Sequence, residues 1–550
     1  MKLRAGLPWG AIGSIAAGTA AIAAHASRFG SWIVDDAAIT FAYARSVASG
    51  LGPVLQPGAA PVEGYSNPSW LALLTVGRWL GLFDHGSLFG IPDYVFYPKA
   101  LALLCCIGIL IAIYRAAAVV TRRAALVTLC AGLLLALIPS FVIWSFSGLE
   151  NSLFAFLVTA LASLLMRAVV EHRMLTAKVA ILAGVLAALA ALTRPDGLIY
   201  VAAFPILALL RVTRPTLVPV IKYSALSGLA FAVPYGGYIA YRLVEFGQLL
   251  SMTAVAKGQQ PPDTQTLIRV SEVIGYGGAL AALVVVVCLG IVIIHPSKLR
   301  LGLVALLVPL SLALAAHSVL MPDWMGEQRF ATPIWPLFAL LAALAVGAAT
   351  VQLNLRARVV LVLAVVVALV PSVSTFKDKS ALFRASPTFP MCFVAERMGH
   401  TFEHYADLLG VQQGTVLMPD IGGSALTTRM VIVDTAGLAE PRIAKMRGEG
   451  TVERDLANYV FDEAKPTFIH EHPAWDPKDM AKDPRLTRDY VPIYNPESVQ
   501  GHNDWVRRDA VKDPKALEAA RAYATVVAGA AYVTTAENPR RSCGDTLRPQ

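Results

Sequence analysis

Residues 35–68, DDAAITFAYARSVASGLGPVLQPGAAPVEGYSNP, decide how this chain is interpreted, because they place acidic side chains directly after an apolar segment. The apolar segment covers residues 8–27, and the adjacent acids Asp35 and Asp36 are followed by Glu63. Carboxylates at the edge of a membrane are costly to hold in a chain that otherwise keeps charge out of lipid. Their placement therefore indicates a site where chemistry takes place.

The composition is that of a membrane protein. Of 550 residues, 56% are hydrophobic and 15% are charged, whereas soluble proteins carry about 25% charged residues. Apolar runs of roughly 17–23 residues, long enough to cross a hydrocarbon core, recur through the first two-thirds of the chain. We expect about eleven transmembrane helices in a polytopic α-helical domain, near residues 8–27, 98–114, 124–143, 152–167, 176–193, 197–210, 217–240, 273–294, 301–320, 330–350 and 359–375.

The composition changes after residue 375, where charged residues, prolines and histidines become common. We therefore predict a transmembrane catalytic domain with outer loops at 1–375 and a soluble α+β domain at 376–550. Short buried strands are expected in GTVLMPD (414–420), MVIVDTAG (430–437) and KPTFIHEH (465–472). Helices are expected at 396–409 and 515–530.

Basic residues predict the orientation. They gather in alternate loops, from Lys2 and Arg4 through Arg122 and Arg123 to Arg356 and Arg358, which should be cytoplasmic. The chain is then a multi-pass membrane protein, with the acidic loops and the C-terminal domain on the outer side. The net charge of +9 is a topology signal, and no basic and aromatic patch suggests nucleic-acid binding. A cleaved signal peptide is the alternative interpretation of the N-terminus.

The first outer loop contains the candidate base. Side chains of adjacent residues alternate in extended structure, so one of Asp35 and Asp36 should face a cavity while the other holds a metal, a turn or a helix N-terminus. Neighbouring carboxylates raise the proton affinity of one member, which suits a general base. An N-cap of the helix that follows is the structural alternative. In VEGYSNPSW, Glu63, Tyr65 and Asn67 suit a sugar face, and a simple turn is the alternative.

Later outer loops add acids and cations. SFSGLENSLF contributes Glu150, LTRPDG contributes Arg194 and Asp196, the loop ending in AKG contributes Lys257, and MPDWMGEQRF contributes Asp323, Trp324 and Arg329. Any one of these charges could form an ordinary salt bridge. Together, Arg194, Lys257 and Arg329 provide cations for a phosphate headgroup, and the remaining residues are candidates for substrate binding.

These stretches resemble GT-C-type polytopic glycosyltransferases that use polyprenyl-phosphate sugars, and within that class the terminal arabinofuranosyltransferases of the mycobacterial cell wall. The matching segments are the DD segment with VEGYSNP, SGLE (147–150), LTRPDG (192–197), AK (256–257), DWM…RF (323–330) and VIVDTAGL (431–438). The chain departs from the pattern at MPDWM, where a more glycine-rich start is expected.

The resemblance implies a GT-C-like, multi-pass enzyme of cell-wall biogenesis in a bacterial inner (plasma) membrane, with its active site and C-terminal domain on the periplasmic side. Asp35 or Asp36 would take the proton of the acceptor hydroxyl, and Lys257, Arg194 or Arg329 would neutralise the departing phosphate. The partners implied are a polyprenyl-phosphate sugar, a glycan or lipid-linked acceptor and membrane lipids. No cofactor is certain; a divalent cation on Asp35 or Asp36 is compatible with the chemistry.

The sequence is also compatible with two other functions. A transporter or lipid flippase would explain the apolar segments, and a non-catalytic glycan-binding protein would explain the polar loops.

Cys392 and Cys543 either pair in an oxidising compartment or remain free thiols. The pattern His400-x-x-Glu403-His404 resembles a zinc-peptidase motif but lacks a third ligand, and the pair His470 and His472 is likewise incomplete as a metal site.

Overall fold

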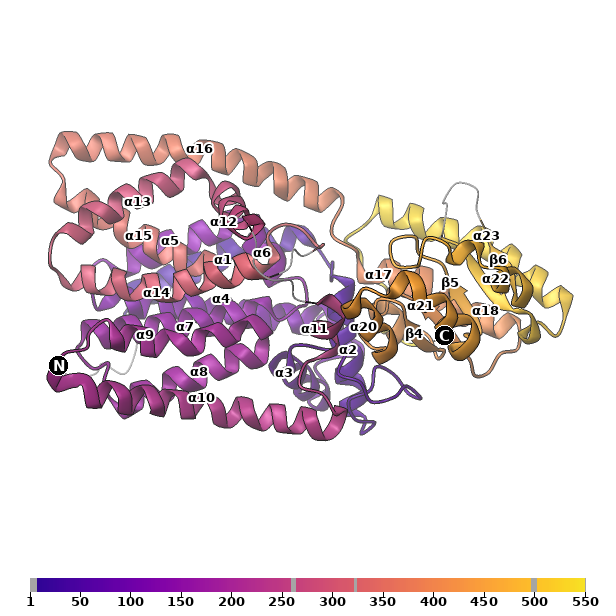
Figure 1. Ribbon diagram of the computed structural model, residues 1–550. Helices are drawn as coiled ribbons and strands as arrows, with labels where there is room; N and C mark the ends of the chain where they lie inside the picture. Colours follow the sequence, from indigo (N-terminus) through magenta and orange to yellow (C-terminus); the bar gives the residue numbers. More distant parts are fainter. Residues whose placement is uncertain (1–6, 259–263, 321–323, 496–501, 550) are drawn as a thin grey trace. The chain divides into compact units, whose positions relative to one another are not determined.

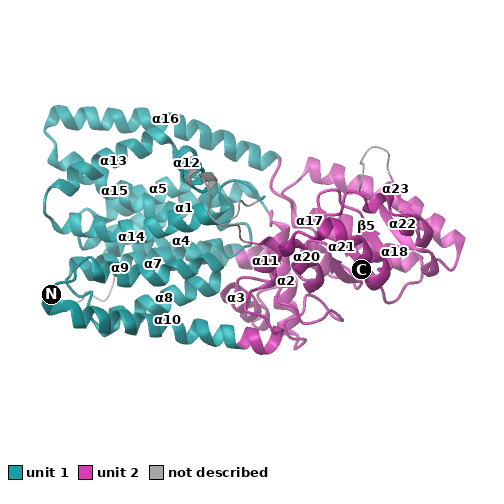
Figure 2. Cartoon of the chain, in the orientation of Figure 1, with its two compact units in different colours: residues 1–30, 99–240, 260–385 teal, residues 31–98, 241–259, 386–550 magenta. Residues whose placement is uncertain are grey.

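The computed structural model describes residues 7–258, 264–320, 324–495 and 502–549. The chain forms two compact units, each assembled from segments that are distant in the sequence (Figure 2). Unit 1 comprises residues 1–30, 99–240 and 260–385, and unit 2 comprises residues 31–98, 241–259 and 386–550. The first outer loop therefore belongs to the same unit as the C-terminal residues. The division at residue 375, which falls inside a helix, stays a prediction about the membrane and outer parts of the chain.

Unit 1 is built from helices (Figure 1). They are α1 (Trp9–Ala26), α4 (Asp93–Ala118, whose first turns belong to unit 2), α5 (Ala124–Leu137), α6 (Pro139–Ser145), α7 (Asn151–Val170), α8 (Ala177–Thr193), α9 (Ala203–Leu209), α10 (Leu217–Phe246, which ends in unit 2), α12 (Thr264–Gly277), α13 (Ala279–Ile294), α14 (Lys298–Val319), α15 (Ile334–Gln352) and α16 (Leu355–Ala385). Short 3-10 segments are η1 (Ser27–Phe29), η2 (Pro195–Ala202), η3 (Arg214–Thr216) and η4 (Arg329–Ala331).

Six described helices are long and apolar enough to cross a membrane, or eight if two bent pairs each count as one span. The eleven expected segments coincide with helical regions, but eleven spans are not confirmed. The pair α5 and α6 bends by 81° at Pro139, which has no backbone N–H to continue the helix. The pair α12 and α13 bends by 94° at Gly278, whose φ of +103° is unfavourable for other residues.

Small residues allow close helix packing in unit 1. A Cβ atom on Gly132 of α5 would lie 2.9 Å from the Cα of Gly18 in α1. The two backbones therefore approach as closely as glycine permits, a common arrangement between helices in membranes.

Unit 2 contains a five-stranded mixed sheet in the order β4-β3-β5-β7-β6. β3 (Thr415–Met418) is parallel to β4 (Val431–Asp434) and β5 (Phe468–His470), and β7 (Asp504–Arg507) is antiparallel to β5 and to β6 (Tyr490–Tyr494). The three predicted strands are confirmed. The other two strands gave no clear signal, because β6 contains Pro492 and β7 has only four residues.

Unit 2 also contains helices, turns and a short ribbon (Figure 1). They are α2 (Asp35–Ala48), α3 (Pro68–Trp79), α11 (Met252–Lys257), α17 (Met391–Val394), the π-helix η5 (Ala395–His400), α18 (Thr401–Leu408), α19 (Gly422–Thr427), α20 (Pro441–Glu449), α21 (Val452–Asn458), the π-helix η6 (Tyr459–Ala464), η7 (Met480–Lys482), α22 (Pro484–Asp489), η8 (Arg508–Ala510) and α23 (Pro514–Glu537), with a two-stranded ribbon β1 (Ser87–Leu88) and β2 (Ile91–Pro92). The helices expected at 396–409 and 515–530 are confirmed. The α+β expectation therefore holds for the C-terminal region.

Residues of both histidine motifs form structural contacts inside unit 2. His470 Nδ1 lies 2.7 Å from Asp504 Oδ1, and Arg397 Nη1 lies 3.0 Å from Asp504 Oδ2, with all three side chains fully buried. Buried charges require such pairing. Glu403 forms an ion pair with Arg429. These contacts are those of a packed interior.

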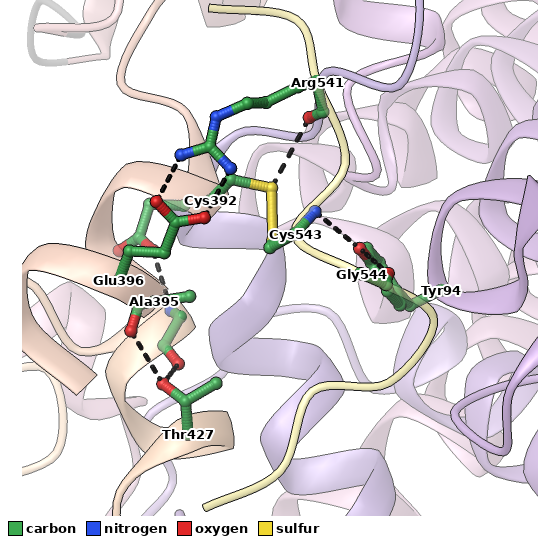
Figure 3. The surroundings of a disulfide bond; sticks show 10 residues. Tyr94, Cys392, Ala395, Glu396, Thr427, Arg541, Cys543 and Gly544 are labelled. Atoms are coloured by element: carbon green, nitrogen blue, oxygen red, sulfur yellow. Dashed lines mark hydrogen bonds and ion pairs between the residues drawn. A yellow bond between two sulfur atoms is a disulfide. The ribbon is translucent and has the colours of Figure 1, made fainter. Parts of the chain in front are cut away.

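A disulfide bond joins Cys392 to Cys543, whose Cα atoms are 5.2 Å apart (Figure 3). Pairing was one of the two alternatives left by the sequence. Around the bond, the Cys543 N–H donates to the Tyr94 hydroxyl at 3.0 Å, and Arg541 forms an ion pair with Glu396. The C-terminal segment is thereby attached to both α4 and η5.

Replacing both disulfide cysteines by serine should lower the stability of unit 2. The bond closes a loop with a sequence separation of 151 residues, and loss of such a bond costs about 2–5 kcal/mol. Thermal unfolding of the detergent-solubilised protein measures the loss. Cys130→Ser, at an exposed free cysteine, is the control and should unfold like wild type. A Cys392→Ser/Cys543→Ser variant with an unchanged melting temperature would contradict this account.

Candidate active site

Both predicted acids lie in the first turn of α2, and the N-cap of this helix is Val34. The prediction that an aspartate caps its own helix is therefore wrong. Asp35 instead caps another helix: its Oδ1 accepts the Gly423 N–H at 2.7 Å, and its Oδ2 accepts the Gly422 N–H at 3.1 Å. These amides begin α19 and have no partner within that helix, so the carboxylate satisfies them.

Backbone pairing fixes the start of α2 to residues 389–391. The Asp35 N–H donates to the Phe389 carbonyl at 3.1 Å, and the Met391 N–H donates to the Ile33 carbonyl at 2.9 Å. Val34 and Pro390 form an isolated antiparallel bridge. Asp35 is therefore held through both its backbone and its side chain, and only 3% of its surface is exposed.

Two further aspartates follow the parallel strands β3 and β4. Met418 pairs with Asp434 in the ladder, so the carboxyl ends of the two strands meet at one edge of the sheet. Asp420 follows β3 after one proline, and Asp434 ends β4. Asp434 accepts the Ala436 and Ala439 N–H groups at 2.7 and 2.8 Å, which folds the chain back after the strand. Ligands commonly bind at the carboxyl ends of parallel strands.

Asp35, Asp36, Asp420 and Asp434 form what we call the acidic cluster. Burial and the nearby carboxylates of Asp420 and Asp36 raise the pKa of Asp35 well above its usual range. Burial, followed by the charges of Asp36 and Asp434, raises the pKa of Asp420 to about 7, and burial raises the pKa of Asp434 to about 6. Burial favours the neutral carboxyl in each case.

Asp36 is the partly exposed member of the predicted pair, whereas Asp35 is buried. Asp35 thus lies at a helix N-terminus, one of the roles expected for one member of the pair, and the expectation that the other member faces a cavity stays a prediction. The segments GTVLMPD and MVIVDTAG were expected to be strands, but Asp420 and Asp434 were not expected at the site. The available signal was an aspartate at or shortly after the end of a short apolar strand, once in each segment.

The remaining residues of the first loop pack together in unit 2. Glu63 is buried and paired with Arg242, whose Nη2 lies 3.0 Å from Glu63 Oε1. Tyr65 packs edge-on against Tyr43 with ring centroids 5.0 Å apart. Thr40 donates to Asn67 Oδ1 at 3.3 Å. Glu63, Tyr65 and Asn67, predicted to bind sugar, thus have structural contacts, and the prediction for them stays untested. Arg242, a cation at the end of α10, was missed.

Lys257 also lies in unit 2, at the exposed end of α11. This short helix is attached to the first loop, because the Met252 N–H donates to the Glu63 carbonyl at 3.2 Å. Its Val255 carbonyl would lie only 2.6 Å from a Cβ atom on Gly448, which shows how closely α11 packs against α20. The structure therefore brings Lys257 together with Glu63 and Arg242 in one unit.

In unit 1, Glu150, Arg194, Asp196 and Arg329 form a second group, the Glu150 cluster. Arg194 Nη1 lies 3.1 Å from Glu150 Oε1, and Arg194 Nε lies 2.9 Å from Asp196 Oδ1. Arg329 Nη2 lies 3.8 Å from Glu150 Oε1. All four side chains are less than one-tenth exposed. Two cations therefore face two acids in a buried place, and the cluster carries no surplus positive charge.

The loop before Arg329 has unusual backbone geometry. Glu327 and Gln328 have φ values of +44° and +49°, a region that residues other than glycine seldom adopt. Tyr276 donates to Glu327 Oε2 at 2.5 Å, and Trp144 Nε1 donates to the Glu327 carbonyl at 3.0 Å. Such strained positions often occur at functional sites. Trp324 is 56% exposed, and Asp323 lies outside the described residues.

The candidate metal site remains a prediction. Carboxylate oxygens are the ligands that Mg²⁺ and Ca²⁺ prefer, and Asp36 and Asp420 supply the right donor type. However, the described part of the chain contains no group of three or more His, Cys, Asp or Glu side chains arranged to hold a metal ion. We therefore derive no reaction step from a metal.

Gly422→Ala should disrupt the contact between α2 and α19. A Cβ atom at this position would lie 2.1 Å from the Asp35 carbonyl oxygen, which is backbone and cannot move aside easily. Forced packing of this kind costs about 1–3 kcal/mol. Thermal unfolding measures the loss. The control Gly529→Ala adds a methyl group where no atom lies within 4 Å and should be neutral or stabilising. Equal melting temperatures for Gly422→Ala and wild type would refute the close contact.

Asp420→Asn should change how stability depends on pH. Because the pKa of Asp420 is about 7 in the folded protein and about 4 in an unfolded chain, the folded state binds the extra proton between these values. The stabilisation that protonated Asp420 contributes to the folded state is complete below pH 4 and is lost as the pH rises through 7. Above pH 7 the asparagine variant should therefore be more stable than wild type, by on the order of 1–2 kcal/mol, with little difference near pH 4.

Melting temperatures recorded from pH 4 to pH 8 test this prediction. Asp479→Asn, at an exposed aspartate, provides a matched control and should follow the wild-type curve. Parallel curves for Asp420→Asn and wild type would mean that Asp420 titrates normally.

Comparisons with known proteins bear on the fold. No protein-family model matches the chain, and no curated protein matches it significantly. Among solved structures, the apo state of ArnT from Cupriavidus metallidurans is similar with a TM-score of 0.57 at 16% identity, over 90% of this chain and 98% of ArnT. ArnT bound to undecaprenyl phosphate gives a TM-score of 0.54 at 14% identity, over 90% and 97%. An oligosaccharyltransferase from Archaeoglobus fulgidus gives 0.49 at 11% identity, over 88% of this chain and 73% of that one.

At these identities the likeness to ArnT establishes the fold alone. It supports the GT-C-like fold expected from the sequence and, with the apolar helices, a multi-pass membrane protein. Similarity to mycobacterial arabinofuranosyltransferases is not shown. The chain therefore has a GT-C-like fold similar to that of ArnT.

Proposed function

We propose that this protein is a membrane glycosyltransferase that moves a sugar from a polyprenyl-phosphate donor to a hydroxyl group of an acceptor. One observation carries the proposal: Asp36 is a partly exposed carboxylate beside buried acids, in unit 2 of a chain with the fold of ArnT. ArnT itself was solved with undecaprenyl phosphate, a polyprenyl phosphate. The ordered sequence motifs support the same class of donor.

Asp36 acts as the general base. The acceptor oxygen attacks the anomeric carbon of the donor sugar, and the bond from that carbon to the phosphate oxygen breaks. Asp36 accepts the hydroxyl proton, and the electron pair of the broken bond leaves on polyprenyl phosphate. Asp35 acts as a positioning residue, because its carboxylate is engaged by the Gly422 and Gly423 amides. Asp420 lies in the field of Asp36, whose charge helps to raise the pKa of Asp420.

Negative charge that develops on the phosphate requires a cation. Lys257 is the first candidate, because it is exposed and belongs to the same unit as the acidic cluster. Arg194 and Arg329 already face Glu150 and Asp196. They bind a phosphate only if those ion pairs rearrange, so we assign them the secondary role.

The acidic cluster faces the periplasm in this proposal. The disulfide between Cys392 and Cys543 supports an oxidising compartment for unit 2, and the basic residues of alternate loops support the same orientation. The donor then lies in the outer leaflet with its isoprenoid chain among the apolar helices. Arabinofuranose as the donor sugar and a cell-wall glycan as the acceptor rest on the motif resemblance alone.

Asp36→Asn should abolish transfer without unfolding the protein. Loss of a general base lowers kcat by about 10²–10⁴-fold, and KM for the donor should change little because the base does not bind the donor. Product is measured by mass spectrometry, with purified protein, a polyprenyl-phosphate sugar and a glycan acceptor. Asp479→Asn serves as the matched control.

Asp35→Asn separates positioning from catalysis. Asparagine retains one oxygen for the amides of α19, so this variant should lose stability together with activity, whereas Asp36→Asn should lose activity only. Transfer by Asp36→Asn within threefold of wild type would reject the assigned base. Movement of the lipid-linked sugar across a bilayer without any glycoside product would instead favour the transporter or flippase.

A further inference from the structure

A groove in unit 1, lined by none of the residues used in the proposed reaction, carries a further inference. It has a volume of about 720 Å³, within the range of small-molecule sites, and is lined by residues of α5, α13, α15 and α16. These helices contact one another (Figure 1). The lining is almost entirely apolar, with leucine, valine and alanine predominant.

One end of the groove is basic. Arg122 and Arg123, which directly precede α5, line it together with Thr121 and Gln352. Both arginines are exposed. Among the described residues neither arginine forms a salt bridge, in contrast to Arg194 and Arg329, which face acids. Two uncompensated guanidinium groups thus lie at the mouth of a groove whose walls are hydrocarbon.

We propose that this groove binds an anionic phospholipid, with its acyl chains between α5, α15 and α16 and its phosphate on Arg122 and Arg123. The groove walls match acyl chains, and guanidinium groups match a phosphodiester because they donate paired hydrogen bonds to its oxygens. Basic pockets between transmembrane helices commonly hold anionic headgroups. The occupant is a phospholipid of the surrounding leaflet.

The glycosyl donor is a less suitable occupant. Arg122 and Arg123 belong to the loops that the distribution of basic residues places at the cytoplasmic end, whereas the donor is expected in the outer leaflet. None of the acids of the acidic cluster lines this groove. The inference is therefore independent of the proposed transferase activity, since it requires only that the chain lies in a membrane.

Glycine positions provide a direct test. Gly347 of α15 lines the groove, and no atom lies within 4 Å of a Cβ built there. Gly347→Leu should therefore fill the groove without a clash in the protein. Gly290 of α13 is equally open but does not line the groove, so Gly290→Leu is the matched control.

The experiment titrates the full-length, delipidated protein in detergent with phosphatidylglycerol or phosphatidylcholine and counts bound lipid by native mass spectrometry. Wild type should bind phosphatidylglycerol about tenfold more tightly than phosphatidylcholine, because two basic residues contribute to the headgroup contact. Arg122→Gln/Arg123→Gln should abolish this preference, and Gly347→Leu should weaken phosphatidylglycerol binding. Gly290→Leu and Arg356→Gln/Arg358→Gln, which changes two exposed arginines outside the groove, should behave like wild type.

Several results would overturn the proposal. Equal affinity of wild type for the two phospholipids would make the groove an ordinary bilayer contact. Unchanged phosphatidylglycerol binding by Gly347→Leu would place the lipid elsewhere, and this variant decides the question even if the arginine variant fails to fold. Undecaprenyl phosphate that binds more tightly than phosphatidylglycerol, and that Gly347→Leu excludes, would identify the groove as a site for a polyprenyl phosphate.

Discussion

The contact between the Asp35 carboxylate and the two leading amides of α19 is the interaction on which the acidic cluster depends. It joins residue 35 to residues 422 and 423 with bonds of 3.1 and 2.7 Å. Residue 422 must be glycine, since a Cβ atom at this position would meet the backbone of Asp35. Because Asp36 follows directly in the first turn of α2, the bonds made by Asp35 fix the position of Asp36 as well. In the proposed reaction, Asp35 therefore positions the base without being the base itself.

The Glu150 cluster and the acidic cluster differ in how their charges are balanced. In the Glu150 cluster, buried arginines and acids neutralise one another, which limits the cost of removing them from water. In the acidic cluster, like charges lie together, and burial raises the pKa of Asp420 and Asp434 to about 7 and about 6. A site that holds protons near neutral pH is suited to proton transfer. The contrast agrees with the proposed function, in which Arg194 and Arg329 are held in ion pairs and the acids take part in the reaction.

Part of the fold and of the candidate site could be predicted from local sequence patterns, and part could not. The length of the apolar segments predicted the helical regions. It did not predict the bends at Pro139 and Gly278, which lower the number of single helices long enough to cross a membrane. Alternating charge identified Glu150, Arg194 and Arg329, but it did not predict that both arginines would face Glu150. Asp420 and Asp434 join the acidic cluster only because β3 and β4 are parallel and end together. Sequence patterns report local periodicity, whereas this site is assembled from segments more than 350 residues apart.

The most direct test of the central claim is the stoichiometry of a single turnover. Purified protein in excess is mixed with a polyprenyl-phosphate sugar and a hydroxyl acceptor, and both products are quantified by mass spectrometry. A glycosyltransferase releases one polyprenyl phosphate for each glycoside formed, and the account predicts this ratio. Intact donor recovered from the opposite leaflet, with neither polyprenyl phosphate nor glycoside formed, would contradict it.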